Sequence, residues 1–186
     1  AKHLWYIYLS LTIACAGAYW LAGMNLFDAI CHAFSTVAIG GFSNHDASLG
    51  YFNSPLVNIV CTVFLLIAAL NFSLHYAAVS SRSVKGYFKD PEFKAFFFIQ
   101  ATLILICFLV LVLSGFYESA ETALDQAMIQ AVSISTTAGF ATTDFSVWPT
   151  FLPILLIFSS FIGGCASSTG GGLKVVRVCL LFLQGK

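Results

Sequence analysis

The sequence predicts an all-α membrane protein made of two similar repeats. Hydrophobic residues make up 59% of the 186 residues and charged residues only 9%, and the mean hydropathy is +0.91. These values lie far outside the range of soluble globular domains. Four apolar stretches, at residues 4–22, 55–79, 93–116 and 150–182, are each long enough to cross a bilayer core of roughly 30 Å as a helix.

An internal repeat divides the chain. A shift of 98 residues places Gly41-Phe42 on Gly139-Phe140, and the same shift aligns residues on both sides of this motif. The further pairs are Ala33 with Ala131, Ser35 with Ser133, Asp46 with Asp144 and Pro55 with Pro153. A constant offset over this length indicates a true repeat. The predicted units are a first repeat at residues 1–79, a cytoplasmic basic linker at residues 80–92 and a second repeat at residues 93–186. Each repeat runs helix, pore helix, loop, helix.

A polar segment at residues 133–144 predicts the lining of a pore. It lies between two long apolar runs, and it is too short to cross a bilayer and too polar to face lipid. Its hydroxyl side chains and Gly139, which tolerates a positive φ, suit a backbone that turns its carbonyls toward a permeating ion. The matching loop of the first repeat lies at residues 37–43.

The charges are unevenly distributed between the two sides expected for four spans. All basic residues fall on one side: Lys2, Arg82, Lys85, Lys89, Lys94, Lys174, Arg177 and Lys186. Six of the eight acids fall on the other side: Asp28, Asp46, Glu118, Glu121, Asp125 and Asp144. Because cytoplasmic loops carry the excess of Lys and Arg, both termini and the linker are expected in the cytoplasm. The outer acids either concentrate cations or are simply solvated.

The first repeat opens with a membrane-spanning helix at residues 1–23. Residues 25–36 follow as a helix of about a dozen residues, which reaches only about halfway across a bilayer. Asn25 or Asp28 is placed to cap its first turn. Such a re-entrant helix aims the negative end of its dipole at the membrane centre, which favours a cation over an anion.

The second helix of this repeat is expected to run without interruption over residues 55–79. Asn71, Ser73 and His75 lie near its inner end, where interhelical hydrogen bonding is favoured and a contribution to the inner pore lining stays open. The basic linker after it is either a topogenic loop or a contact for anionic lipid or a cytoplasmic partner.

The second repeat has a spanning helix at residues 93–116, a pore helix at residues 118–134 and a final helix that begins at Pro149 or Pro153. Residues 161–173 place five glycines and three hydroxyl residues in the middle of that helix. Each Gly costs about 1 kcal/mol against Ala in a helix interior, so this run is expected to be unwound below the polar loop. Broken helices mark transport sites or gates, whereas small-residue helix packing is the alternative. A phosphate-binding P-loop is rejected because Leu173 separates the last Gly from Lys174.

The loops Thr36-Val-Ala-Ile-Gly-Gly-Phe and Ser135-Thr-Thr-Ala-Gly-Phe-Ala-Thr-Thr, with the run Gly163-Gly-Cys-Ala-Ser-Ser-Thr-Gly-Gly-Gly-Leu-Lys174, resemble the TrkH/KtrB family of bacterial potassium transporters. The resemblance covers essentially the whole chain and is nearest to the TrkH branch. It implies potassium transport across the bacterial inner membrane. The implied selectivity filter comprises Ala38, Ile39, Gly40, Gly41, Thr136, Thr137, Ala138 and Gly139, with potassium bound through backbone carbonyls at Gly41 and Gly139.

The resemblance also implies a gating loop and partners. The gating residues are Gly163, Gly164, Ser167, Ser168, Thr169, Gly170, Gly171 and Gly172. The family has four such repeats around one pore, and this chain resembles the second and third. Either further repeats of the same protein or a second copy must complete the filter. The implied partners are membrane lipid, a homodimer mate and a TrkA-like cytoplasmic nucleotide-binding subunit, with no nucleic acid. Potassium is the substrate, and no covalently bound cofactor is expected.

Two other classes stay open. An intramembrane enzyme would use Ser167 or Ser168, but no partner that activates either hydroxyl is evident in the sequence. A non-conducting scaffold would use the polar loops only for packing. Six scattered cysteines without metal-ligand spacing are expected to be small buried hydrophobes. The start at Ala1, without Met, suggests a segment of a longer protein.

Overall fold

The computed structural model describes residues 2–149 and 151–184, and all regular structure within these residues is helical. The predicted all-α fold is confirmed. The α-helices are α1 Lys2–Leu21, α2 Leu26–Val37, α3 Pro55–Ala68, α4 Phe72–Ser81, α5 Lys85–Lys89, α6 Pro91–Leu113, α7 Ala120–Ser135, α8 Leu152–Ser160 and α9 Val175–Gln184. Two 3₁₀ turns, η1 Ser48–Phe52 and η2 Phe145–Val147, complete the list. Ala1, Thr150 and residues 185–186, which the predicted repeats include, lie outside the described residues.

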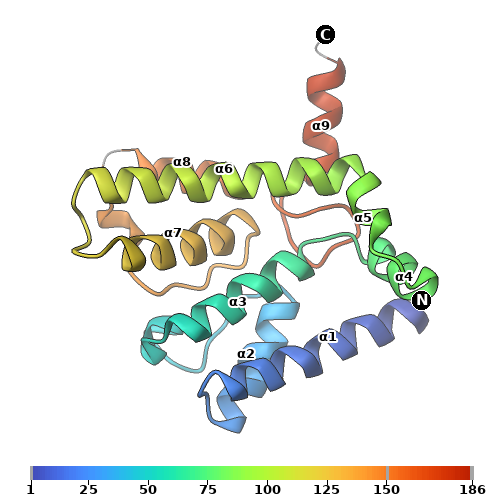
Figure 1. The fold of residues 1–186 in the computed structure, drawn as a ribbon, viewed down its shortest axis with the longest axis horizontal. Coiled ribbons are helices and arrows are strands. Elements are labelled where there is room, and N and C mark those ends of the chain that lie inside the picture. Colours follow the sequence, from blue (N-terminus) through green and yellow to red (C-terminus); the bar gives the residue numbers. More distant parts are fainter. Residues whose placement is uncertain (1, 150, 185–186) are drawn as a thin grey trace.

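The helices form two groups joined through α3 and α7. In one group α2 packs against α1 and α3, and in the other α7 packs against α6 and α8 (Figure 1). Contacts between α3 and α7 bring the groups together. Helix α9 contacts α6 and projects away from the rest of the chain. The loops that follow α2 and α7 therefore meet in the middle of the molecule.

The two short helices begin and end as their sequences dictate. The side chain of Asn25 accepts a hydrogen bond from the Asp28 N–H at 2.8 Å, and that of Ser119 accepts one from the Glu121 N–H at 3.1 Å. Such caps satisfy donors that a helix start leaves free. With 12 and 16 residues, α2 and α7 are too short to cross a bilayer.

The prediction of one continuous helix over residues 55–79 is wrong. Helices α3 and α4 meet at an angle of 89°. The Asn71 side chain accepts a hydrogen bond from the Ser73 N–H at 2.8 Å and so begins a new helix. The carbonyls freed at the end of α3 accept hydrogen bonds from residues distant in sequence. The Ala69 carbonyl, for example, accepts one from the Cys165 N–H at 2.8 Å. The break persists because another segment satisfies the backbone groups that the bend releases.

Two described helices, α1 and α6, are long and apolar enough to span a membrane, and a bent α3–α4 pair would be a third. Large apolar side chains on them are exposed, including Leu21 and Leu113, as expected of a surface that meets lipid. The favoured role of His75 is confirmed, since its ring bonds the Tyr87 hydroxyl at 2.6 Å and the Ile67 carbonyl at 3.0 Å.

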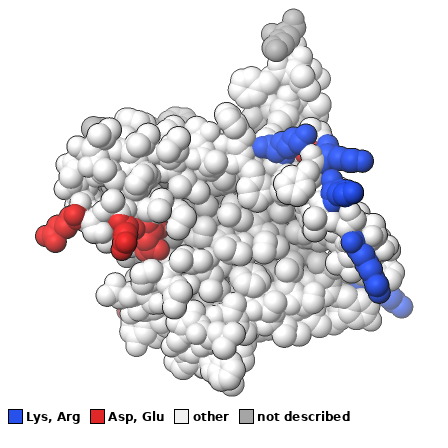
Figure 2. All heavy atoms as spheres, viewed as in Figure 1, with Lys and Arg blue, Asp and Glu red and all other residues white. Residues whose placement is uncertain are grey.

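Basic and acidic side chains gather at opposite ends of the molecule (Figure 2). Figure 2 shows Lys and Arg gathered at the end where α4 and α5 lie, and Asp and Glu at the end where α7 begins. This distribution matches the separation of basic and acidic residues predicted from the sequence. The basic end also holds the first residues of α1 and the start of α6.

Candidate functional site

The loops after α2 and α7 share one backbone conformation. We call residues 38–47 the first loop and residues 136–144 the second loop. Each begins with a right-handed residue, and positive φ angles follow at positions related by the 98-residue shift. These angles are 52° at Ile39 and 72° at Thr137, and 68° at Gly41 and 88° at Gly139. A left-handed β-branched residue is strained, and strain of this kind concentrates at functional sites.

At the start of each loop most N–H groups are used, whereas the carbonyls of residues 38–41 and 136–139 are not. The N–H groups of Ala38 to Gly40 and Thr136 to Gly139 donate to carbonyls in the last turns of α2 and α7, at 2.7–3.1 Å. Over the described part of the chain, no hydrogen-bond donor reaches the carbonyls of residues 38–41 or 136–139. Alternating right- and left-handed residues bring successive N–H groups to one side and leave the carbonyls for another partner. Carbonyls without a donor suit a ligand that is a cation.

The loops lie against each other. A Cβ added to Gly41 would stand 1.9 Å from the Ala138 carbonyl oxygen, so only glycine fits there. Beyond this contact, the Gly50 N–H donates to the Ala141 carbonyl at 3.2 Å. The same added atom at Gly139 would meet nothing within 4 Å among the described residues. The second loop thus fills the space beside the first, and the matching space beside the second loop is open.

A polar network behind each loop ties it to its helix. In the first repeat, His32 on α2 bonds the Ser43 hydroxyl at 2.9 Å, and the Asp28 carboxylate accepts from His45 at 3.1 Å and from Asn44. Burial by itself raises the pKa of Asp28, but these hydrogen bonds outweigh it and hold the pKa of the carboxyl below its ordinary value. The carboxyl therefore stays ionised at neutral pH.

The side chains that bond the second loop from α7 are neutral. Gln126 accepts from the Thr142 hydroxyl at 2.5 Å, and Gln130 donates to the Thr143 carbonyl at 3.1 Å. The 98-residue shift places Asp28 on Gln126 and His32 on Gln130. Sequence reasoning missed both networks, although this alignment of polar residues inside two apolar helices was the available signal.

The Gly-rich segment, residues 161–174, is not helical and lies against both loops. The Thr169 hydroxyl donates to the Val37 carbonyl at 2.8 Å, next to the first loop. The Gly171 N–H donates to the Thr137 hydroxyl in the second loop at 2.8 Å. An added Cβ at Gly170 would come within 3.1 Å of the Thr136 carbonyl oxygen. The segment therefore adjoins the unpartnered carbonyls.

The Gly-rich segment folds back on itself. The Leu173 and Lys174 N–H groups donate to the Phe161 and Ile162 carbonyls at 2.9 Å. Gly163, with φ of 73°, leaves no room for a side chain, because an added Cβ would stand 2.0 Å from the Gly171 carbonyl oxygen. The glycines are needed where the two arms of the segment meet.

A possible Ser–Lys pair lies inside this segment and was not anticipated. The Lys174 ammonium lies 3.4 Å from the Ser168 hydroxyl and also donates to the Gly170 carbonyl. The Ser168 hydroxyl donates to the Cys165 carbonyl at 2.6 Å. Because the lysine acts as a donor and the serine proton already has an acceptor, this geometry does not activate a nucleophile.

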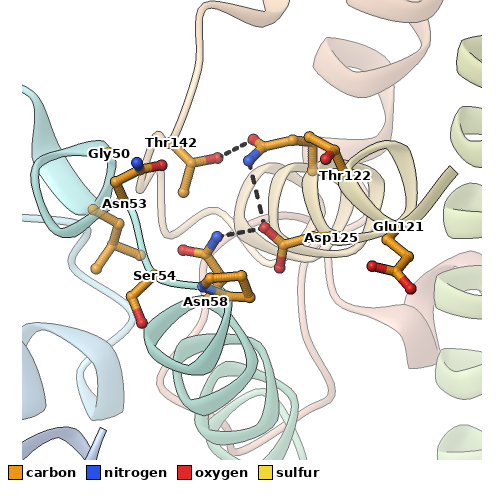
Figure 3. Close-up of a pocket in the computed structure, with 11 residues that line it drawn as sticks. Gly50, Asn53, Ser54, Asn58, Glu121, Thr122, Asp125 and Thr142 are labelled. Carbon is orange, nitrogen blue, oxygen red and sulfur yellow. Dashed lines mark hydrogen bonds between the residues drawn. The ribbon is translucent and has the colours of Figure 1, made fainter. Parts of the chain in front are cut away.

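An acidic pocket of about 290 Å³ opens between α3 and α7 near η1. Figure 3 shows Asn58 donating to Asp125, at 2.7 Å, with Glu121 and Thr142 also on the pocket wall. Burial raises the pKa of Asp125, and the hydrogen bond from Asn58 opposes this shift. No group of three or more His, Cys, Asp or Glu side chains within residues 2–149 and 151–184 is arranged to hold a metal ion.

The structure brings most of the predicted site residues together. The residues expected to form the filter, Ala38–Gly41 and Thr136–Gly139, occupy the two loops where these touch. Of the residues expected to form the gate, Thr169, Gly170 and Gly171 lie at the loops. Gly163, Gly164 and Gly172 lie where the arms of the Gly-rich segment meet, and the Ser167 carbonyl accepts from the Phe72 N–H at 3.1 Å.

Comparison with known proteins places this arrangement in a family. The sequence model of the family described as TrkH, cation transport protein, matches residues 1–186. The chain belongs to the TrkH family. It is 66% identical over its whole length to the Trk system potassium uptake protein TrkH of Vibrio parahaemolyticus, of which it covers 39%. It is 57% identical to TrkH and 42% identical to TrkG of Escherichia coli K12, covering 38% of each.

A solved structure shows the same fold. The crystal structure of the potassium transporter TrkH from Vibrio parahaemolyticus matches 99% of this chain with a TM-score of 0.96 and 66% identity, over 40% of that protein's length. The chain thus spans about two fifths of the relatives it matches. Relatives in this family bear names of potassium transporters and not of enzymes.

Proposed function

We propose that this chain supplies two of the loops that surround a potassium ion in a Trk-type uptake system of the bacterial inner membrane. The single observation that carries the proposal is the row of carbonyls at residues 38–41 and 136–139, which no donor of the described residues reaches. Backbone carbonyls replace the hydration shell of potassium in selective pores. The names of the relatives supply potassium as the ion.

The electrostatics around the loops favour a cation. Helices α2 and α7 both end at the loops, and the C-terminal end of a helix carries a partial negative charge of about half an electron. The loop residues 38–41 and 136–139 have no charged side chains, so an ion there would be held by dipoles alone. Such a site stabilises a cation without a fixed countercharge that would trap it.

Two loops cannot enclose an ion, so we propose that further repeats of the same protein complete the ring. Gly41 packs against the Ala138 carbonyl, whereas the corresponding space beside Gly139 is open among the described residues. The next loop is proposed to fill this space. The share of the relatives' length that this chain leaves uncovered provides the missing repeats. A homodimer of complete proteins is the proposed assembly. We also propose that the chain divides into a first repeat at residues 1–79, a linker at residues 80–92 and a second repeat at residues 93–186.

The Gly-rich segment is the proposed gate. It touches the end of α2 through Thr169 and the second loop through Gly171, and it joins α8 to α9 without helical hydrogen bonding that would fix its position. The basic end of the molecule is the proposed cytoplasmic side, and both termini are proposed to lie on that side of the membrane. A TrkA-like nucleotide-binding subunit is the proposed cytoplasmic partner.

The test is rubidium uptake by the full-length protein in potassium-loaded liposomes. Uptake should be blocked by added potassium and little affected by sodium, and Gly139→Ser should abolish uptake or make it sodium-permissive. The φ of 88° at Gly139 strains any other residue and shifts the adjoining carbonyls. A non-conducting scaffold predicts no uptake from either protein, and that result would overturn the proposal.

A further inference from the structure

A single carboxylate closes the Gly-rich segment. Oε1 of Glu92, in the first turn of α6, accepts the Ala166 N–H at 2.7 Å and the Val176 N–H at 3.1 Å. These donors lie ten residues apart, on either side of the Gly-rich loop that carries Thr169 to Gly172. The acceptor belongs to a different helix, 74 and 84 residues away in sequence.

The geometry of α9 explains why a distant acceptor is needed. The residue before this helix is Lys174, whose side chain only donates and so cannot cap the helix start. Val176 is the second residue of α9, and its N–H has no partner within its own helix. Glu92 supplies the missing acceptor, and its negative charge lies at the positive end of the α9 dipole.

The other contacts of the Gly-rich segment are made between neutral groups or come from Lys174. Hydrogen bonds to a carboxylate are about twice as strong as neutral ones. Glu92 is half-buried, so water competes less for it than for an exposed carboxylate. Glu92 joins Ala166, within the segment, and Val176, just after it, to one oxygen atom.

We propose that Glu92 is a positioning residue that latches the Gly-rich segment against the loops. The proposal rests on the proposed role of that segment as the gate. Glu92 lies just after α5 and two residues after Asp90, which caps α6. A movement of the basic linker would therefore displace the Glu92 carboxylate. Loss of the latch should free both arms of the segment and raise the flux of the resting protein.

The experiment compares full-length Glu92→Ala and Glu92→Gln with Lys94→Ala in liposomes, without any cytoplasmic partner. Lys94 lies on the same turn of α6, is exposed and makes no side-chain hydrogen bond among the described residues, so it controls for a change of one charge. Glu92→Ala should raise potassium-competed rubidium uptake about tenfold, which corresponds to about 1.4 kcal/mol. Glu92→Gln keeps one acceptor oxygen without the charge, so its effect should be smaller and in the same direction. Lys94→Ala should match the wild type.

A second readout reports the segment directly. Cys165 is 1% exposed and lies next to Ala166, so it is shielded while the latch holds. With Cys165 as the single cysteine, labelling by a water-soluble maleimide should be about tenfold faster in Glu92→Ala and intermediate in Glu92→Gln. If the wild type conducts and both Glu92 variants match it in uptake and labelling, the latch is wrong. If the wild type fails to transport, the proposed function is wrong, whereas labelling still decides whether Glu92 holds the segment. Glu92→Gln, which keeps the side-chain shape, decides the question if Glu92→Ala does not fold.

Discussion

Replacement of Gly41 by alanine should separate the two loops and abolish selective transport. The φ of 68° alone costs an L-residue about 1–2 kcal/mol. The added Cβ would stand 1.9 Å from the Ala138 carbonyl oxygen, well below the 3.0 Å that real contacts keep. Both sides of this contact are backbone, so no rotamer relieves it. The loops would have to move apart by about 1 Å, and misplacement on this scale costs about 100-fold in function.

The control for this prediction is Gly115→Ala. Gly115 also has a positive φ, of 62°, but an added Cβ there meets nothing within 4 Å. It ends α6 outside the loops, so its replacement introduces the strain without the clash. Rubidium uptake per molecule by the full-length protein should fall about 100-fold in Gly41→Ala and stay near the wild type in Gly115→Ala. Normal uptake and selectivity in a folded Gly41→Ala protein would refute the close contact of the loops.

Three further predictions test the surroundings of the loops. Asp125→Asn should raise the potassium concentration for half-maximal uptake at least about twofold at low ionic strength, with the maximal rate unchanged. The difference should shrink at high salt, because screening weakens the attraction between the carboxylate and potassium, and an effect that does not depend on salt would contradict this. Thr137→Val removes the acceptor of the Gly171 N–H and should raise resting flux about fivefold, whereas Thr137→Ser should not; equal fluxes would show that this bond does not hold the segment. Tyr87→Phe leaves Nδ1 of the buried His75 ring without a partner and should lower the unfolding free energy by about 1 kcal/mol in thermal melts, a loss that should disappear when His75 is also replaced.

The sequence predicted the helices that pattern and composition control. Apolar length placed α1 and α6, the caps Asn25 and Ser119 begin the short helices close to the expected residues, and the glycine content of residues 161–173 identified a break in the last helix. The 98-residue shift then indicated which loops correspond. These features depend on local chemistry, which a single sequence contains.

The bend between α3 and α4 depends on a partner distant in sequence and was missed. Residues 55–79 are apolar enough for a continuous helix, and Asn71 was interpreted as an interhelical contact when it caps a new helix. The bend is stable only because the Cys165 and Thr169 N–H groups reach the carbonyls that it frees. The 98-residue shift places residues 69–71 on residues 167–169 of the Gly-rich segment, and applying the repeat to this position would have predicted the break.

The contact from Glu92 to the Gly-rich segment had no signal in the sequence. A glutamate in the first turn of a helix is ordinarily explained by the helix dipole. Residue spacing cannot identify an N–H donor that lies 74 residues further along the chain. The same holds for the contact between Gly41 and Ala138, which results from packing of the two repeats.

The central claim is that the carbonyls of residues 38–41 and 136–139 coordinate the transported ion. Anomalous X-ray diffraction from crystals of the full-length protein, grown in rubidium, locates that ion directly. The account predicts an anomalous peak within coordination distance of carbonyl oxygens from both loops, lost when Gly41 is replaced by alanine. A peak only in the acidic pocket beside Asp125, with none at the loops, would contradict it.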